Sequence, residues 1–269
     1  MLKPRAVAIV LALLSTALLP GQGAAAPDQT QRAARWNELQ TAIFGARTVQ
    51  AADGLIAMET PDRALDAAYV PITLTMPQKD KVAAVYLFVD DNPSPYAAHF
   101  TFGPAADPSQ IRLKVRVDSY TDIHAVVETK DGALHQTSRY VKASGGCSAP
   151  AGVTPEEASK GMGEMSLKLP AAIRTSAPVE GVLTIRHPNF NGMQMDQATR
   201  GYTPARFIRE VKVSSGGQSI FTLNADISLS SDPVISFRFM PQNAPIEVSA
   251  LDSQDGRWAR SFVTAPAGR

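Results

Sequence analysis

The sequence predicts an all-β fold with two immunoglobulin-like β-sandwich domains in tandem. Apolar and charged residues alternate strictly from Ile111 to Asp118, which is typical of a half-buried antiparallel strand. The 20 prolines and 18 glycines separate short apolar runs, which favours turns and short strands over long helices. The runs fall into two sets, each over about 100 residues, as expected for two sandwiches.

Residues 1–26 have the pattern of an export signal. Lys3 and Arg5 precede an apolar stretch, and the small residues Ala24–Ala26 follow it. The apolar stretch is short for a membrane span, which takes about 20 residues. We therefore expect a signal peptide, and a soluble mature chain that works outside the cytoplasm without a membrane partner.

One short helix is predicted before the strands. Trp36, Leu39 and Ile43 recur at helical spacing, and Gly45 follows them as a stop. We expect this apolar face to pack on the first sandwich.

From Val70 onward the apolar residues recur with the two-residue period of strands. Hairpin turns are predicted at Asp131-Gly132, Gly216-Gly217 and Asp255-Gly256, and a polar turn begins at Asp90. The predicted strands lie near 70–76, 82–89, 97–103, 111–118, 122–129, 134–142, 165–170, 180–187, 207–214, 218–224, 233–240, 245–251 and 257–264.

A segment of small and polar residues, 143–164, separates the two sets of strands. It lacks the alternation of a strand, so it is predicted to be a flexible linker between the sandwiches. Within it, Thr154, Pro155 and Glu157 match a helix capping box with proline at the first helical position.

Composition excludes several functions. A net charge of +1 argues against a nucleic-acid binder, which needs a basic face. A single cysteine excludes a disulfide framework and any zinc site built from several thiolates. The sequence contains no phosphate-binding loop, zinc-protease motif or nucleophile elbow, so we expect no cofactor and no enzymatic activity.

The one cysteine, Cys147, is the strongest functional candidate. It lies in the linker among residues with small side chains, where apolar neighbours for a core cysteine are lacking, so we predict an exposed thiol. No histidine within ten residues could activate it as a catalytic nucleophile. A covalent attachment point or an intermolecular disulfide remain as its uses. The residues expected to form its flexible arm are Ser144, Gly145, Gly146 and Ser148.

The two halves resemble two subunits of the periplasmic thiosulfate-oxidising system. The first half resembles SoxY, the sulfur-carrying subunit, in Pro61-Asp62-Arg63-Ala64, Asn92-Pro93-Ser94-Pro95, Ala98-His99-Phe100 and Gly145-Gly146-Cys147. The second half resembles SoxZ, its partner subunit, in Ile185-Arg186-His187-Pro188, Pro204-Ala205-Arg206-Phe207-Ile208 and Asn224-Ala225-Asp226-Ile227-Ser228. In SoxY the chain ends shortly after the cysteine motif, whereas here Ser148-Ala149-Pro150 follows and the chain continues.

The resemblance implies a periplasmic carrier that holds a sulfur intermediate covalently on Cys147. The fused order is similar to SoxYZ-like carriers associated with quinoprotein dehydrogenases. It implies partner enzymes that load and process the adduct, and docking of the two domains on each other. The alternative is an accessory protein of a quinoprotein dehydrogenase and its cytochrome c, without sulfur cargo. The implied segments are a signal peptide (1–26), a SoxY-like sandwich with the helix (27–142), the arm and linker (143–164) and a SoxZ-like sandwich (165–269).

No metal site is expected, and the sequence contains one weak candidate for copper. His187, Met193 and Met195 lie close in sequence, and a histidine with thioethers can bind copper. A histidine at a strand end followed by a loop with core methionines explains the same pattern and is favoured.

Overall fold

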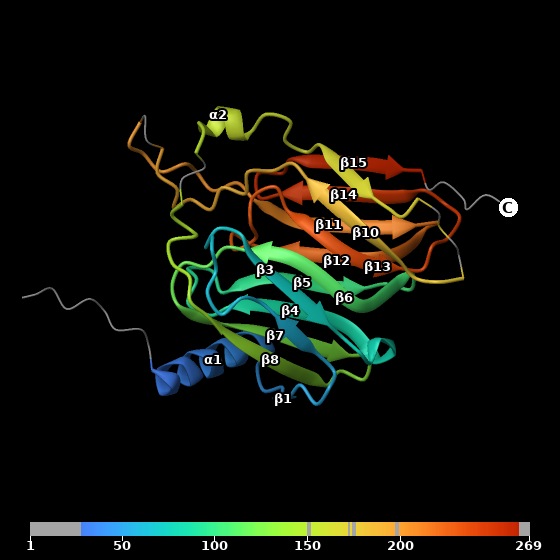
Figure 1. Cartoon of the computed structure of the whole chain (residues 1–269), viewed down its shortest axis with the longest axis horizontal. Coiled ribbons are helices and arrows are strands. Elements are labelled where there is room, and N and C mark those ends of the chain that lie inside the picture. Colours follow the sequence, from blue (N-terminus) through green and yellow to red (C-terminus); the bar gives the residue numbers. More distant parts are fainter. Residues whose placement is uncertain (1–27, 150–151, 172, 174–175, 197–198, 264–269) are drawn as a thin grey trace, which may run out of the picture.

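The computed structural model describes residues 28–149, 152–171, 173, 176–196 and 199–263. The expected signal peptide lies outside the described residues. The described part of the chain is built mainly from β-strands, as predicted (Figure 1). None of the described helices is long and apolar enough to cross a membrane.

The predicted N-terminal helix is α1 (Gln29–Phe44). Asp28 caps its first turn through a capping box, and Gly45 ends it with a positive φ of 62°. Trp36 is buried as predicted, but Ile43 is 43% exposed and Phe44 is buried in its place. The expected face was therefore wrong by one residue at its C-terminal end.

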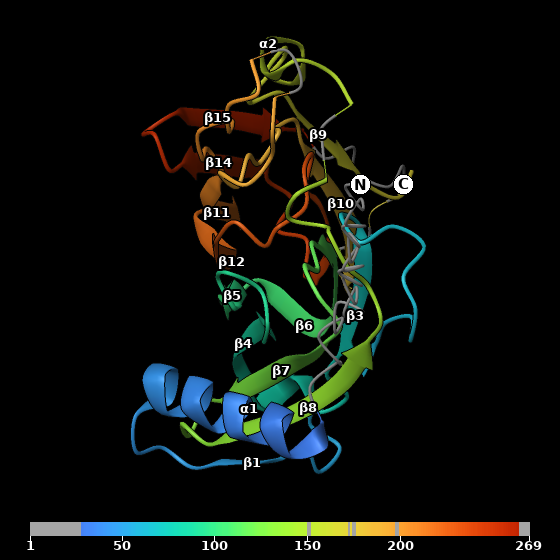
Figure 2. The ribbon, with the colours of Figure 1, turned by 90° about the vertical axis from the view of Figure 1, so that its left-hand side faces the viewer.

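Fifteen strands build two stacked sheets in the part of the chain that the structure describes. The nine-stranded sheet has the order β1-β8-β7-β4-β5-β12-β11-β14-β15, and the six-stranded sheet the order β2-β3-β6-β13-β10-β9 (Figure 2). Their bounds are β1 (Val49–Ala51), β2 (Ala57–Glu59), β3 (Val70–Thr75), β4 (Val82–Val89), β5 (Tyr96–Phe102), β6 (Ala106–Val115), β7 (Thr121–Thr129), β8 (Leu134–Val141), β9 (Met165–Lys168), β10 (Val179–Ile185), β11 (Ile208–Ser215), β12 (Gln218–Ala225), β13 (Val234–Phe239), β14 (Ile246–Asp252) and β15 (Arg257–Phe262).

The two sandwiches share both of their sheets. In the large sheet β5 of the first half pairs antiparallel with β12 of the second, and in the small sheet β6 pairs with β13. The halves therefore join edge to edge, and one continuous hydrophobic core fills the space between the layers across the seam. This pairing satisfies backbone groups that two separate sandwiches would leave on open edges.

Strand β4 is buried on both faces, which explains its nearly continuous apolar sequence. Val85, Leu87 and Val89 point into the main core, while Phe88 faces α1 on the opposite side. Trp36 of α1 stacks on His124 with ring centroids 3.8 Å apart and also contacts Phe88. The helix thus covers the outer face of the large sheet (Figure 2).

The predicted turns agree with the structure. Gly132, Gly216 and Gly217 have positive φ, as does Asp255. The capping box at Thr154 opens a short helix, α2 (Pro155–Ala158). Strands β1 and β2 were not predicted, because three-residue edge strands carry too little periodicity to detect.

The shared core predicts cooperative unfolding of both halves. Phe221 of β12 is fully buried and contacts Phe100 of the first half and Phe237 of the second, with ring centroids 5.5 and 5.1 Å apart. We expect Phe221→Ala to cost about 3–5 kcal/mol of unfolding free energy. In urea titrations, the fluorescence of Trp36 in one half and Trp258 in the other should shift to lower urea together.

Single-tryptophan proteins (Trp258→Phe or Trp36→Phe) separate the two signals, and Leu65→Ala, at a fully exposed side chain, is the control. A Trp36 transition that stays in place in Phe221→Ala would show that the first half unfolds independently.

Candidate functional site

Cys147 lies at the seam between the two halves and is fully buried. Its exposed fraction is 0%, so the predicted exposed thiol is wrong for this structure. The arm (residues 143–149) forms a turn at Gly146–Ser148 and is hydrogen-bonded to both halves. The segment predicted to be a flexible arm is held on two sides by backbone and side-chain hydrogen bonds in this structure.

The first half holds the arm through the backbone after β6. The amide of Gly145 donates to the carbonyl of Asp118 at 2.8 Å, and that of Gly146 donates to the carbonyl of Val117 at 2.9 Å. Gly146 has no room for a side chain, since a Cβ atom would lie 2.1 Å from the carbonyl oxygen of Ala67. Gly146 therefore permits close packing and Gly145 adopts a positive φ of 79°, whereas the sequence predicts that the two glycines make the arm flexible.

The second half holds the arm through the loop of residues 187–194, which we call the clasp loop. Asn191 Nδ2 donates to the carbonyl of Cys147 at 2.7 Å, and Gln194 Nε2 donates to that of Ala149 at 3.2 Å. Both side chains are about 95% buried, at 5% exposed. The main chain at the cysteine and just after it is thus bonded to side chains of the other half.

The thiol is flanked by one buried cation and one carboxylate. Burial raises the pKa of Cys147 to about 12, and nearby Asp118 raises it further while Arg116 opposes the shift. A thiol with this pKa is almost entirely protonated at neutral pH, so it is a poor nucleophile in the closed arrangement. Chemistry at the sulfur requires the arm to leave the seam.

Arg116 is an unusual component of this site. Its side chain is buried, and its guanidinium donates to the carbonyls of Pro188 and Asn189 in the clasp loop at 3.3 and 3.0 Å. Among the described residues no carboxylate forms an ion pair with it, and its Nε has no hydrogen-bond partner. Burial lowers its pKa, yet an arginine stays charged in proteins.

Sequence reasoning missed Arg116, Asn191 and Asn92. Asn92 Nδ2 donates to the carbonyl of Arg116 at 2.8 Å, and its Oδ1 accepts from the amide of Asp118 at 2.9 Å. The alternation of residues 111–118 placed Arg116 on a solvated face. Strand β6 ends at Val115, however, and the amide of Arg116 bonds Ser228 across the seam instead. The clasp loop of the second half contributes to its burial.

The copper candidate finds no support in the geometry. His187 is fully buried; its Nδ1 accepts from the amide of Asn189 at 3.1 Å, and its Nε2 faces Asp252 at 3.5 Å. Both ring nitrogens are therefore engaged, while Met195 is 42% exposed. No group of three or more histidine, cysteine, aspartate or glutamate side chains suited to a metal occurs among the described residues.

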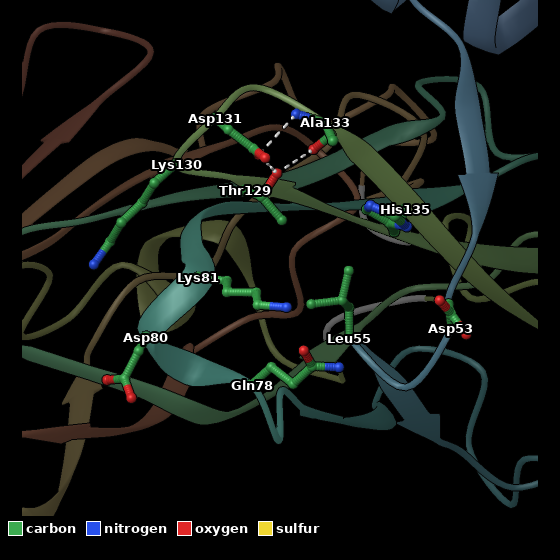
Figure 3. A pocket seen from close by; sticks show the side chains of 10 residues that line it. All are labelled: Asp53, Leu55, Gln78, Asp80, Lys81, Thr129, Lys130, Asp131, Ala133 and His135. Atoms are coloured by element: carbon green, nitrogen blue, oxygen red, sulfur yellow. Dashed lines mark hydrogen bonds between the residues drawn. The ribbon is translucent and has the colours of Figure 1, made fainter.

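A shallow pocket lies at the other end of β4 from the arm. Figure 3 shows charged side chains of both signs around Leu55, including Asp53, Lys81 and Lys130. Asn92, which bonds the amide of Asp118 beside the arm, follows the last residue of β4, whereas Lys81 of the pocket directly precedes the first residue of β4. The two ends of this eight-residue strand are about 25 Å apart. The pocket is thus separate from the cysteine site.

Comparisons with known families agree with this two-part architecture. The family described as "Sulfur oxidation protein SoxY" matches residues 40–147, and that described as "Sulphur oxidation protein SoxZ" matches residues 167–263. The two matches define a protein built from the domains of sulfur-oxidation proteins. The chain belongs to the SoxY and SoxZ families, fused in tandem in that order.

Solved structures give weaker similarities. One is "Structure of the sulfur carrier protein SoxY from Chlorobium limicola f thiosulfatophilum", 26% identical, covering 42% of this chain and 94% of that chain with a TM-score of 0.36. Another, a β-glycosidase from Bacteroides vulgatus, is 9% identical, covers 78% of this chain and 24% of that chain, and has a TM-score of 0.22. A search of curated proteins found no match. The assignment rests on the two family matches.

The packing of Gly146 predicts how the arm can be displaced. In Gly146→Ala the added methyl group overlaps the carbonyl of Ala67, so we expect the turn to leave the seam and Cys147 to react with iodoacetamide at least about tenfold faster. Gly201→Ala is the matched control, since its new Cβ meets only Thr199 Oγ1 at 3.5 Å. Equal labelling rates in a folded Gly146→Ala protein would contradict this packing.

The raised pKa of Cys147 predicts a pH dependence of stability. The folded state keeps the thiol proton up to about pH 12, whereas the unfolded thiol loses it near pH 8.5. Above about pH 9, wild type should therefore lose stability relative to Cys147→Ser by about 1.4 kcal/mol per pH unit. Urea titrations at pH 8, 9 and 10 measure the difference in unfolding free energy between the two proteins. Ionisation of the tyrosines affects both proteins equally and cancels in this difference. If the unfolding free energies of wild type and Cys147→Ser change with pH in parallel, the thiol ionises in the folded protein as it does in the unfolded chain, and the prediction is wrong.

Proposed function

We propose that this protein is a non-enzymatic covalent carrier that holds a sulfur-containing intermediate on Cys147 and presents it to partner enzymes. The observation that supports this most directly is that the SoxY match ends on Cys147, the only cysteine of the chain, after Gly145-Gly146. The N-terminal pattern of residues 1–26 supports a periplasmic location. The partners would be the periplasmic enzymes that load and unload the sulfur.

The geometry gives the carrier a closed resting state. With its thiol buried and protonated, Cys147 is protected from indiscriminate oxidants and disulfides. Asp118, the carboxylate beside the thiol, raises its pKa instead of promoting its ionisation, so a partner enzyme would supply the acid, base or redox centre once the arm is displaced. A carrier needs only a reachable sulfur and a protein that recognises it.

The burial of Cys147 also favours a second candidate. An immunoglobulin-like interaction protein that assists a periplasmic quinoprotein dehydrogenase and its cytochrome c would have no use for a reactive thiol, and a buried cysteine suits that role. In that case the surfaces of the sandwiches would carry the function.

Intact-mass analysis and one substitution separate the two candidates. Protein purified from its own periplasm without reductant should show, as a carrier, a mass increase that maps to Cys147 and disappears on reduction. Cys147→Ser should fold like wild type yet abolish function in the native host. Wild-type growth of that strain, with an unmodified thiol in the purified protein, would refute the carrier and leave the interaction protein.

A further inference from the structure

The clasp loop contacts the arm at the carbonyl of the cysteine and at a second carbonyl just after it in the chain. Asn191 Nδ2 bonds the carbonyl of Cys147 itself, and Gln194 Nε2 bonds that of Ala149 two residues later. The bond to Cys147 is buried, so water is largely excluded from it, and the bond to Ala149 is part-buried. The second half thus fixes the carrier residue of the first.

The orientation of the Asn191 amide is determined at both ends. Its Oδ1 accepts from the amide of Met193 at 2.9 Å, which leaves Nδ2 pointing at the arm. Asn191 therefore acts as a preset donor whose one partner across the seam is the Cys147 carbonyl.

Two buried polar atoms oppose this closed arrangement. Arg116 Nε and Gln194 Oε1 lack hydrogen-bond partners among the described residues, and the buried Arg116 charge interacts with Tyr69, Cys147 and Asp66 but forms no ion pair with a described carboxylate. Unpaired buried polar groups and charges are costly. The closed arrangement therefore combines the favourable bonds of the clasp loop with two polar atoms, Arg116 Nε and Gln194 Oε1, that would be hydrogen-bonded by water if the arm opened. This balance is expected for a segment that opens without unfolding the core.

We propose that Asn191, supported by Gln194, is a positioning residue through which the second half holds the Cys147 arm closed, and that loading of the sulfur requires these two bonds to break. The inference rests on the carrier function proposed above, because it assigns the control of access to the same sulfur. It gives the SoxZ-like half a direct role: it determines when the thiol of the SoxY-like half is accessible.

The sharpest test is Asn191→Asp. The aspartate keeps an oxygen that accepts from Met193 but places a second oxygen against the Cys147 carbonyl in place of the donor. In the full chain, iodoacetamide should then modify Cys147 at least about fivefold faster than in wild type. Asn243→Asp is the matched control, since it makes the same chemical change on an exposed turn.

Hydrogen exchange distinguishes release of the arm from general destabilisation. Loss of the clasp should speed exchange of the Gly145 and Gly146 amides while that of Val126 in β7 stays at the wild-type rate. Gln194→Glu, which removes the donor to Ala149, should act in the same direction and decides the matter if Asn191→Asp does not fold. Folded variants with wild-type labelling and wild-type exchange at Gly145 and Gly146 would overturn the proposal.

The labelling rates of the clasp variants test the clasp contacts whether or not Cys147 carries sulfur. If the clasp variants label faster but Cys147 never carries sulfur in the host, the closing contact stands and the carrier function fails. If Cys147 carries sulfur but the variants label at the wild-type rate, the carrier stands and the clasp is refuted.

Discussion

Strand pairing across the seam is the constraint on which the site depends. The ladders β5–β12 and β6–β13 fix the two halves in one register and merge their cores. The clasp loop leaves the end of β10 and the arm leaves the end of β8, so only this register brings Asn191 to the carbonyl of Cys147. The same pairing lets the carbonyls of Pro188 and Asn189 reach Arg116.

Closure and reactivity exclude each other at this cysteine. The interactions that hold the arm also bury the sulfur and raise its pKa to about 12, far above the range in which thiolates are abundant. A carrier with such a thiol gains protection in an oxidising compartment, since neither sulfenic acid nor a mixed disulfide forms readily from a buried thiol. Specificity then depends on which partner can release the arm.

Local patterning predicted the fold well and the site poorly, for a physical reason. Strands β3 to β15, the capping box at Thr154 and the glycine turns follow from neighbours in sequence, and the structure agrees. Phe44 in place of Ile43 is a small error of helix phase. The burial of Cys147 depends on contacts with Val117, Asn191 and Gln194, residues 30 to 47 positions away, and small residues in a linker are compatible with both a free and a packed arm.

Fusion of the two halves limits how far the sulfur can travel. The backbone of Lys142 is tied to Asp62 and Ala64, so in the proposed open state of the carrier the free part of the arm would begin at Ala143. Five residues lead from Lys142 to Cys147, which allows an extended reach of about 17 Å. Because the chain continues to the second half, the sulfur must enter a partner at the tip of a loop, with two strands of chain side by side. A partner of this carrier therefore needs a wide, shallow site, whereas a narrow channel would suit an arm with a free end.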